Sequence, residues 1–256
     1  MKHRPKIAIV SLTSCEGCQF AILDLGKEFI KLSDQVDLGE FRLVEEMPED
    51  KNAVYDIAFV EGSPVTLDNK RYLKQIRRQA KKLVVLGNCA ALGGVPEIKN
   101  YQGPIKAFFS VYKKSKRSRP AVINEITNLV KVDYIIAGCP INAQEFYRVT
   151  KELLAGQQPE PYKLPVCVEC QTRGYDCFLK KGQFCLGPIT MAGCEAICVK
   201  SRMHCQGCRG LVPNKNIFAF VVMMEKRHGK ERLKREMEMF GLRDEVEAKV
   251  KKEMKI

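Results

Sequence analysis

The spacing of the twelve cysteines constrains the fold of this 256-residue chain more than any other feature. Four of them lie in the first 155 residues, and each of their three sites follows a short apolar run. The other eight lie within residues 165–213, a segment with little regular periodicity and few large apolar side chains. Because such a segment cannot form a conventional core by itself, we expect bound metal to supply much of its stability.

The first 155 residues alternate apolar runs with amphipathic segments. Continuous, β-branched runs without polar alternation predict strands of a parallel sheet covered on both faces, at residues 7–12, 41–46, 55–60, 83–86 and 134–137. Between them, LDNKRYLKQIRRQAKK carries Leu73, Ile76 and Ala80 at the spacing of a buried helical stripe. This alternation predicts the α/β class, with a doubly wound parallel sheet.

A change of composition marks the end of the predicted sheet. AGQQPEPYKLP, at residues 155–165, is rich in Gly, Gln and Pro and is typical of a linker. We therefore predict a sheet domain at residues 1–155, a cysteine-rich domain at 156–213 and a helical tail at 214–256. The tail repeats apolar residues at helical spacing in two sets, Leu233, Met237 and Phe240, then Leu242, Val246 and Val250. These stripes predict helices packed on a neighbouring segment, or alternatively facing a partner subunit.

The N-terminus and the charge bear on the compartment and the partners. MKHRPKIAIV has a basic start, but its apolar run is short and no small-residue cleavage site follows, so we expect a cytoplasmic protein. A reducing compartment disfavours disulfides, which makes metal-bound thiolates the better account of twelve cysteines. The formal charge of +13 counts every cysteine as neutral. Three iron–sulfur cubes on twelve thiolates would lower it to about +7.

Two classes of partner are disfavoured by the sequence. No apolar stretch approaches the roughly 18 to 20 residues that cross a bilayer. The basic run KKSKRSR at residues 113–119 has no interleaved aromatic residues for base stacking. We expect a solvated loop there and no nucleic-acid partner.

The four cysteines of the first region all follow predicted strands. Cys15 and Cys18 follow IAIVSL, Cys89 follows LVVLGN, and Cys139 follows YIIAG. Because the loops after parallel strands open on one edge of a sheet, we expect these thiols to converge there. Four sulfurs suit zinc and an iron–sulfur cluster equally well. A buried, unreactive thiol is the alternative for any single one of them.

Two carboxylates accompany these cysteines. Glu61, in DIAFVEGS, falls at the same predicted edge of the sheet. Its carboxylate could cap a helix, form hydrogen bonds within a loop or act as a functional acid. Glu16 lies between Cys15 and Cys18. Beside a negatively charged cluster its pKa would rise, which would suit proton transfer, whereas a solvent-facing Glu16 would have no such role.

The remaining cysteines occur in CVECQTRGYDC, CLGPITMAGCEAIC and CQGC. They divide most simply into two sets of four, Cys167, Cys170, Cys177 and Cys185, then Cys194, Cys198, Cys205 and Cys208. Zinc ribbons place paired CxxC motifs about 15–20 residues apart. Here the two CxxC motifs are 38 residues apart with four single cysteines between them, so two iron–sulfur cubes fit better.

Taken in order, the motifs resemble the small, electron-transferring subunit of NiFe hydrogenases. They span residues 1–213 and are TSCEGC, VEGS, GNCAALGGV, GCP, PVCVEC, CLGPITMAGC and CQGCRG. The last two look most like the cytosolic branch, in particular the sulfhydrogenase delta subunit, as does the tail FGLRDEVEAKVKK. The resemblance implies a flavodoxin-like domain followed by a cysteine-rich iron–sulfur domain.

The resemblance also implies a role for each set of cysteines. Cys15, Cys18, Cys89 and Cys139 match the ligands of a proximal 4Fe-4S cluster; Cys167, Cys170, Cys177 and Cys185 match those of a distal one; Cys194, Cys198, Cys205 and Cys208 match a medial one. Membrane-bound relatives have histidine where Cys167 stands, and the medial site here gains Cys198, so three all-cysteine 4Fe-4S clusters are implied. Thiolate in place of imidazole lowers a cluster's potential, which favours nicotinamide or ferredoxin over quinone as the acceptor.

By the same resemblance, the nickel–iron site lies in a large partner subunit, and this chain contains no catalytic residue. Glu16 and Glu61 stay candidates for proton transfer. Flavin- and iron–sulfur-containing diaphorase-type subunits are the expected further partners, and the twin-arginine leader of exported relatives is missing. Two alternatives stay open, a cluster-bearing subunit of a complex-I-like oxidoreductase and a zinc-stabilised nucleic-acid-binding module. The former typically has adjacent cysteines where this chain has CxxC, and lacks an eight-cysteine extension.

Overall fold

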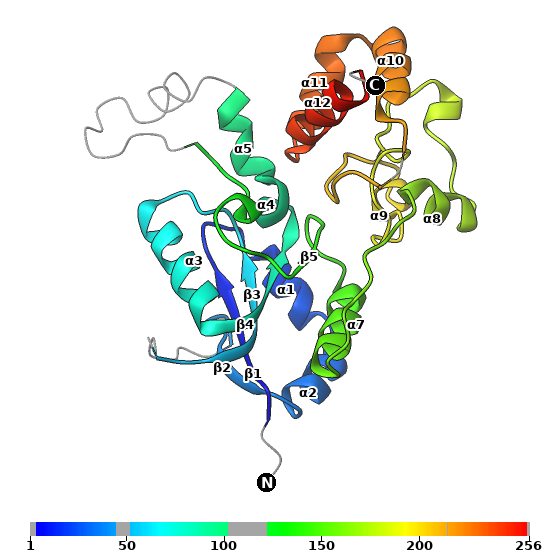
Figure 1. Ribbon diagram of the computed structural model, residues 1–256. Coiled ribbons are helices and arrows are strands. Elements are labelled where there is room, and N and C mark those ends of the chain that lie inside the picture. The colour runs from blue at the N-terminus through cyan, green and yellow to red at the C-terminus, as the bar shows by residue number, and fades with distance from the viewer. Residues whose placement is uncertain (1–3, 45–51, 102–121, 214, 255–256) are drawn as a thin grey trace. The chain divides into compact units, whose positions relative to one another are not determined.

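A computed structural model describes residues 4–44, 52–101, 122–213 and 215–254 of the chain (Figure 1). They form two compact units, Met1–Pro159 and Glu160–Ile256. The division falls inside the Gly- and Pro-rich stretch at residues 155–165. The basic run at residues 113–119 lies outside the described residues.

The first unit contains an all-parallel, five-stranded sheet with the strand order β2-β1-β3-β4-β5. Its strands are β1 (Lys6–Ser11), β2 (Asp37–Glu40), β3 (Tyr55–Glu61), β4 (Ala80–Leu86) and β5 (Tyr134–Ile136). The predicted α/β class and parallel sheet are confirmed. The strand order is that of flavodoxin-like, doubly wound sheets.

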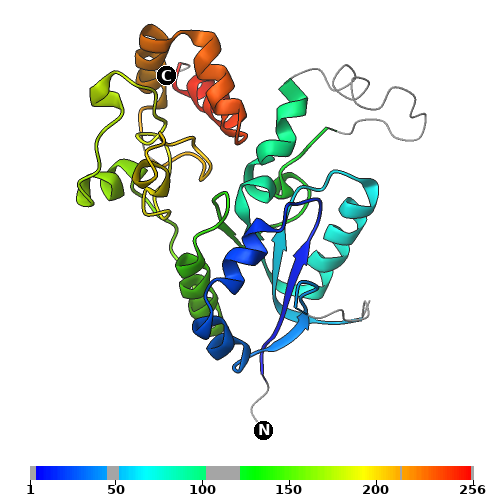
Figure 2. The same ribbon diagram turned by 180° about the vertical axis from the view of Figure 1, so that it is seen from behind.

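Helices cover both faces of this sheet, as Figures 1 and 2 show from opposite sides. They are α1 (Gly17–Leu23), α2 (Lys27–Ser33), α3 (Leu67–Gln79), α4 (Gly87–Leu92), α5 (Gly94–Tyr101), the 3-10 helix η1 (Ile126–Asn128) and α7 (Ala143–Leu154). Helices α1, α2 and α7 pack on one face, and α3 and α4 pack on the other.

Strand β1 shows why the apolar runs are continuous. Ile7 and Ile9 lie in the core beneath α1 and α7, whereas Ala8 and Val10 lie in the core beneath α3 and α4. Successive side chains of a strand point to opposite faces, so a sheet buried on both faces needs apolar residues at every position.

Helix α3 confirms the predicted amphipathic segment. Leu73 and Ile76 are buried, and the side chain of Thr66 caps the helix by accepting a hydrogen bond from the Asn69 N–H at 3.0 Å. Ala80, predicted as the third member of the stripe, is buried as the first residue of β4. The strand therefore begins directly where the helix ends.

The strand predicted at residues 41–46 is wrong at residues 41–44, which lie outside the strands, and its last two residues lie outside the described residues. The second strand is Asp37–Glu40, with the sequence DLGE, at the edge of the sheet. Phe41 is buried after the strand ends, with its ring 6.0 Å from that of Phe29 in α2. An apolar run indicates that its residues are buried, but an edge strand is held by backbone hydrogen bonds and needs few apolar side chains. The apolar pattern therefore indicated the residues after the strand.

The second unit combines the cysteine-rich segment with the helices that follow it. Its helices are α8 (Val166–Thr172), the 3-10 helix η2 (Leu179–Lys181), α9 (Ile197–Lys200), α10 (Ile217–His228), α11 (Lys230–Glu238) and α12 (Leu242–Glu253). Phe184, Leu186 and Ile189 share one hydrophobic core with residues from the last three helices. The cysteine-rich segment thus obtains from the tail the apolar partners that it lacks by itself.

Within the described residues, no helix is both long and apolar enough to cross a bilayer.

Candidate metal centres

The four cysteines of the first unit lie in loops or helix starts that follow three strands. Cys15 and Cys18 follow β1, Cys89 lies in α4 directly after β4, and Cys139 follows β5. Burial, together with the negative charges of Cys139 and Cys15, raises the pKa of the Cys89 thiol to about 11. Burial, the charge of Glu61 and, more weakly, that of Cys139 raise the pKa of Cys18. The structure therefore brings together four thiols from three strand ends.

Glycine leaves space beside two of these sulfurs. Gly87, which opens α4 with φ +81°, lies so close to Cys18 that a Cβ atom there would overlap its Sγ. A Cβ atom on Gly17 would lie 3.4 Å from the Sγ of Cys15. Side chains at these positions would occupy the volume next to the sulfurs, and glycine keeps that volume open.

Glu61 is buried against the first cysteine motif. It ends β3, is 2% exposed, and accepts hydrogen bonds from the Cys18 N–H to Oε1 and from Gln19 Nε2 to Oε2, each at 3.0 Å. Of the three roles considered for this carboxylate, the structure therefore shows hydrogen bonding to the start of α1. Its two oxygens tie the loop carrying Cys15 and Cys18 to the middle of the sheet.

Glu16 differs from Glu61 in its exposure and in its hydrogen bonds. It is exposed and precedes α1 in the left-handed conformation, at φ 62°. Its side chain makes no capping hydrogen bond to α1, and its N–H donates to Ser14 Oγ at 3.3 Å. Of the two carboxylates, only Glu61 contacts the cysteine loop through its side chain within the described residues.

Ser63, the serine of VEGS, is a site residue that sequence reasoning missed. It is fully buried, and its hydroxyl donates to the carbonyl oxygen of Cys89 at 2.9 Å. Its N–H donates to Thr13 O at 2.9 Å, which joins the loop after β3 to the loop after β1. The VEGS motif could have indicated this role, because a small polar residue just after a strand end can form hydrogen bonds to neighbouring loops.

The first four cysteines of the second unit interact with one another. Burial, together with the charges of Cys185, Cys170 and Cys177, raises the pKa of Cys167 to about 12. Gly187 lies between two of them, because its added Cβ atom would be 3.4 Å from the Sγ of both Cys167 and Cys185. The Gly187 N–H also donates to Cys185 Sγ at 3.4 Å.

The last four cysteines interact as two pairs that adjoin the previous set. Burial and the charges of Cys185 and Cys208 raise the pKa of Cys205. Burial and the charge of Glu169 raise the pKa of Cys194, and Cys198 contributes less. Because Cys185 interacts with members of both sets, the two sets are neighbours within this unit.

Two charged residues beside Cys194 were not singled out from the sequence. Glu169 stands between Cys167 and Cys170; its Oε1 accepts from the Gly193 N–H at 2.8 Å, and its Oε2 lies 3.9 Å from Cys194 Sγ. Arg209 is 2% exposed, and its Nε donates to the carbonyl oxygen of Ala192 at 2.7 Å. The CxxC spacing predicts which cysteines bind metal, but it gives no role to the residues between and after them, such as Glu169 and Arg209.

Cysteine thiols are the donor type that iron–sulfur clusters use. Each of the twelve is free of disulfide bonds. Among the described residues, no three His, Cys, Asp or Glu side chains are spaced to hold a single metal ion. A four-iron cube binds one thiolate at each iron atom, so its ligands stand farther apart than those of one ion. The neighbouring thiols of each unit, with glycine beside several sulfurs, fit ligands of iron–sulfur clusters.

Comparison with known proteins identifies the family. Residues 15–153 match the family described as NADH ubiquinone oxidoreductase, 20 kDa subunit. The chain is 29% identical to the delta subunit of sulfhydrogenase 2 from Pyrococcus furiosus, over 92% of this chain and 99% of that one. It is 24% identical to the iron–sulfur subunit of an F420-non-reducing hydrogenase from Archaeoglobus profundus, over 81% of this chain and 83% of that one.

A solved structure is also similar. A chain of an NAD+-reducing [NiFe]-hydrogenase in its H2-reduced state superposes with a TM-score of 0.55 and 26% identity, covering 62% of this chain and 95% of that chain. The family match ends at residue 153, whereas the sulfhydrogenase match also takes in most of the cysteine-rich unit. The chain belongs to the family of the 20 kDa subunit of NADH ubiquinone oxidoreductase, and it is a hydrogenase-type oxidoreductase subunit, as its motifs predicted.

Proposed function

We propose that this chain is the electron-transfer subunit of a cytoplasmic NiFe hydrogenase. It relays electrons between the nickel–iron site of a large subunit and an acceptor subunit. Three 4Fe-4S clusters are assigned to the sets already described, the proximal to Cys15, Cys18, Cys89 and Cys139, the distal to Cys167, Cys170, Cys177 and Cys185, and the medial to Cys194, Cys198, Cys205 and Cys208.

The observation that carries this proposal is the interaction of Cys89 with Cys15 and Cys139. Three chain segments far apart in sequence supply these thiols, and β-strand packing holds each of them. Grouped thiols repel one another when ionised, which disfavours a metal-free thiolate site. The positive charge of iron offsets that repulsion, so the grouping supports a metal-bound state.

The chain's own residues position the sulfurs and limit what surrounds them. Glu61 holds the loop of Cys18 through two buried hydrogen bonds. Gly187 directs an N–H at Cys185 Sγ, and such hydrogen bonds to sulfur influence a cluster's reduction potential. When bound, iron–sulfur clusters supply one-electron transfer. Glu16, at the surface, retains only a proposed role in proton exit.

The proposed partners are a NiFe large subunit and flavin- and iron–sulfur-containing diaphorase-type subunits. The similarity to a chain of an NAD+-reducing hydrogenase supports NAD(P) as the eventual acceptor. The proposed location is the cytoplasm, whose reducing conditions keep thiols free to bind metal.

Oxygen-free purification tests the proposal. We expect a brown protein with about twelve iron atoms per chain and paramagnetic signals of reduced 4Fe-4S clusters. Hydrogen-dependent dye reduction should require the large subunit, so activity of the isolated chain would contradict the assignment. A colourless protein containing zinc would instead favour the zinc-stabilised module. A complex with iron but no nickel, active with quinone, would favour the complex-I-like alternative.

A further inference from the structure

Helix α10 is apolar around most of its circumference. Its sequence begins IFAFVVMM, and Ile217, Phe220 and Met224 are buried in the core of the second unit. A surface helix normally carries polar residues on the side away from the core. On α10 that side carries Phe218 and Val222, which are 40% and 48% exposed.

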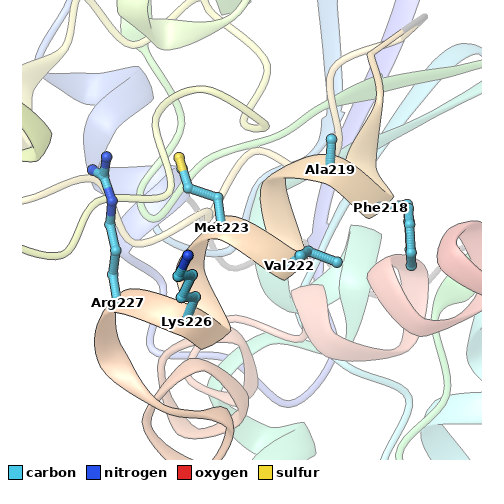
Figure 3. Close-up of a pocket in the computed structure, with 6 residues that line it drawn as sticks. All are labelled: Phe218, Ala219, Val222, Met223, Lys226 and Arg227. Carbon is cyan, nitrogen blue, oxygen red and sulfur yellow. The ribbon is translucent and has the colours of Figure 1, made fainter.

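The outer side of α10 lines a shallow pocket of about 650 Å³. Figure 3 shows its six side chains along one helix, Phe218, Ala219, Val222, Met223, Lys226 and Arg227. Within the described part of the chain no other element contributes a lining residue, so the pocket has no opposing wall to enclose a small molecule. Such a surface suits the apolar face of another polypeptide.

Charge distinguishes the kind of polypeptide. Lys226 and Arg227 are exposed at the C-terminal end of α10, and neither forms an ion pair within the described residues. The chain carries a formal charge of +13 with neutral cysteines and about +7 with three clusters bound, so a second copy would add like charge. The complementary partner is an apolar segment with acidic side chains at one end.

We propose that the outer face of α10 docks an apolar, acidic segment of the electron-acceptor subunit. This rests on the proposed function, because the choice of the acceptor follows from what lies behind the helix. His228, at the end of α10, packs on Phe184 with 5.4 Å between ring centroids, and Phe184 directly precedes Cys185. Helix α10 therefore packs on the segment that carries Cys185, and a partner bound to its outer face lies one helix away from that segment.

Zero-length carbodiimide cross-linking of the intact purified complex tests the docking. This reagent joins a lysine amine to a carboxylate in contact with it, so Lys226 should link to Asp or Glu of the flavin-binding subunit. Lys226→Arg should abolish the link and keep the subunit bound. A link from Lys226 to the large subunit or to a second copy would overturn the proposal. So would a Lys226 that stays as reactive in the complex as in the free chain.

A charge-reversal pair provides the second measurement. Lys226→Glu with Arg227→Glu should lower the amount of flavin-binding subunit in the purified complex by about tenfold or more. Lys251→Glu with Lys252→Glu, an equal change at exposed positions of α12, should leave that amount unchanged. Equal amounts in the two variants would overturn the proposal. Iron content and hydrogen-dependent dye reduction, measured on the same samples, report independently on the proposed function.

Discussion

The buried carboxylate of Glu61 offers the sharpest test of how the first cysteine site is held. Its side chain is 2% exposed and accepts two hydrogen bonds, from the Cys18 backbone and from the Gln19 side chain. Replacement by alanine removes both acceptors and leaves two buried donors without them. Hydrogen bonds to a charged acceptor contribute about 1.5–3 kcal/mol each, so Glu61→Ala should cost about 3–6 kcal/mol.

Glu61→Gln divides this cost. The glutamine carbonyl can still accept from the Cys18 N–H, but its amide faces the amide of Gln19 and one bond is lost unless Gln19 turns over. We therefore expect about half of the alanine effect. For a unit of this size about 1 kcal/mol corresponds to about 2–4 °C, so Glu61→Ala should lower the melting temperature by about 6–24 °C.

Glu16→Ala is the matched control, since Glu16 is an exposed carboxylate between Cys15 and Cys18 and its side chain makes no capping hydrogen bond. It should change stability by less than about 0.5 kcal/mol. The assay is circular dichroism melting of anaerobic, iron-loaded protein, with cluster absorbance followed in parallel. Equal melting temperatures for Glu61→Ala and Glu16→Ala would show that the buried hydrogen bonds do not support the loop.

Three further variants probe the proposed clusters. Cys198→Ala should convert one 4Fe-4S cluster to a 3Fe-4S cluster because it removes one thiolate, and an unchanged paramagnetic resonance spectrum would mean that the last eight cysteines divide otherwise. Gly87→Ala places a Cβ atom against the Sγ of Cys18, at a residue whose φ is +81°. Purified protein should therefore lose about four iron atoms per chain. Full iron content would contradict the close approach. Glu169→Gln removes a negative charge whose Oε2 lies 3.9 Å from Cys194 Sγ, so redox titration should show one cluster with a raised potential, while unshifted potentials would exclude this electrostatic role.

Several features of the molecule could be read from local patterns. The continuous apolar runs predicted four of the five strands to within a few residues. A strand buried on both faces needs apolar side chains at successive positions, so it appears in the sequence as an unbroken apolar run. The cysteines at strand ends could likewise be placed at one edge, because parallel strands present their C-terminal ends together. Edge strand β2 escaped prediction because its residues, DLGE, gain little from burial.

Other features depend on segments that meet only after folding. Glu61 and Glu16 look equally suited to a role beside Cys18 in the sequence, yet only Glu61, 43 residues away from it, reaches its backbone. The core that joins Phe184 to α10, α11 and α12 could not be predicted from local patterns either. An apolar stripe shows that a helix packs on something, but not on which segment. Periodicity and spacing determined most of the secondary structure of this chain and placed four of its thiols after strand ends. Tertiary packing decided which charges and apolar faces meet, because those contacts depend on distances through space and not along the sequence.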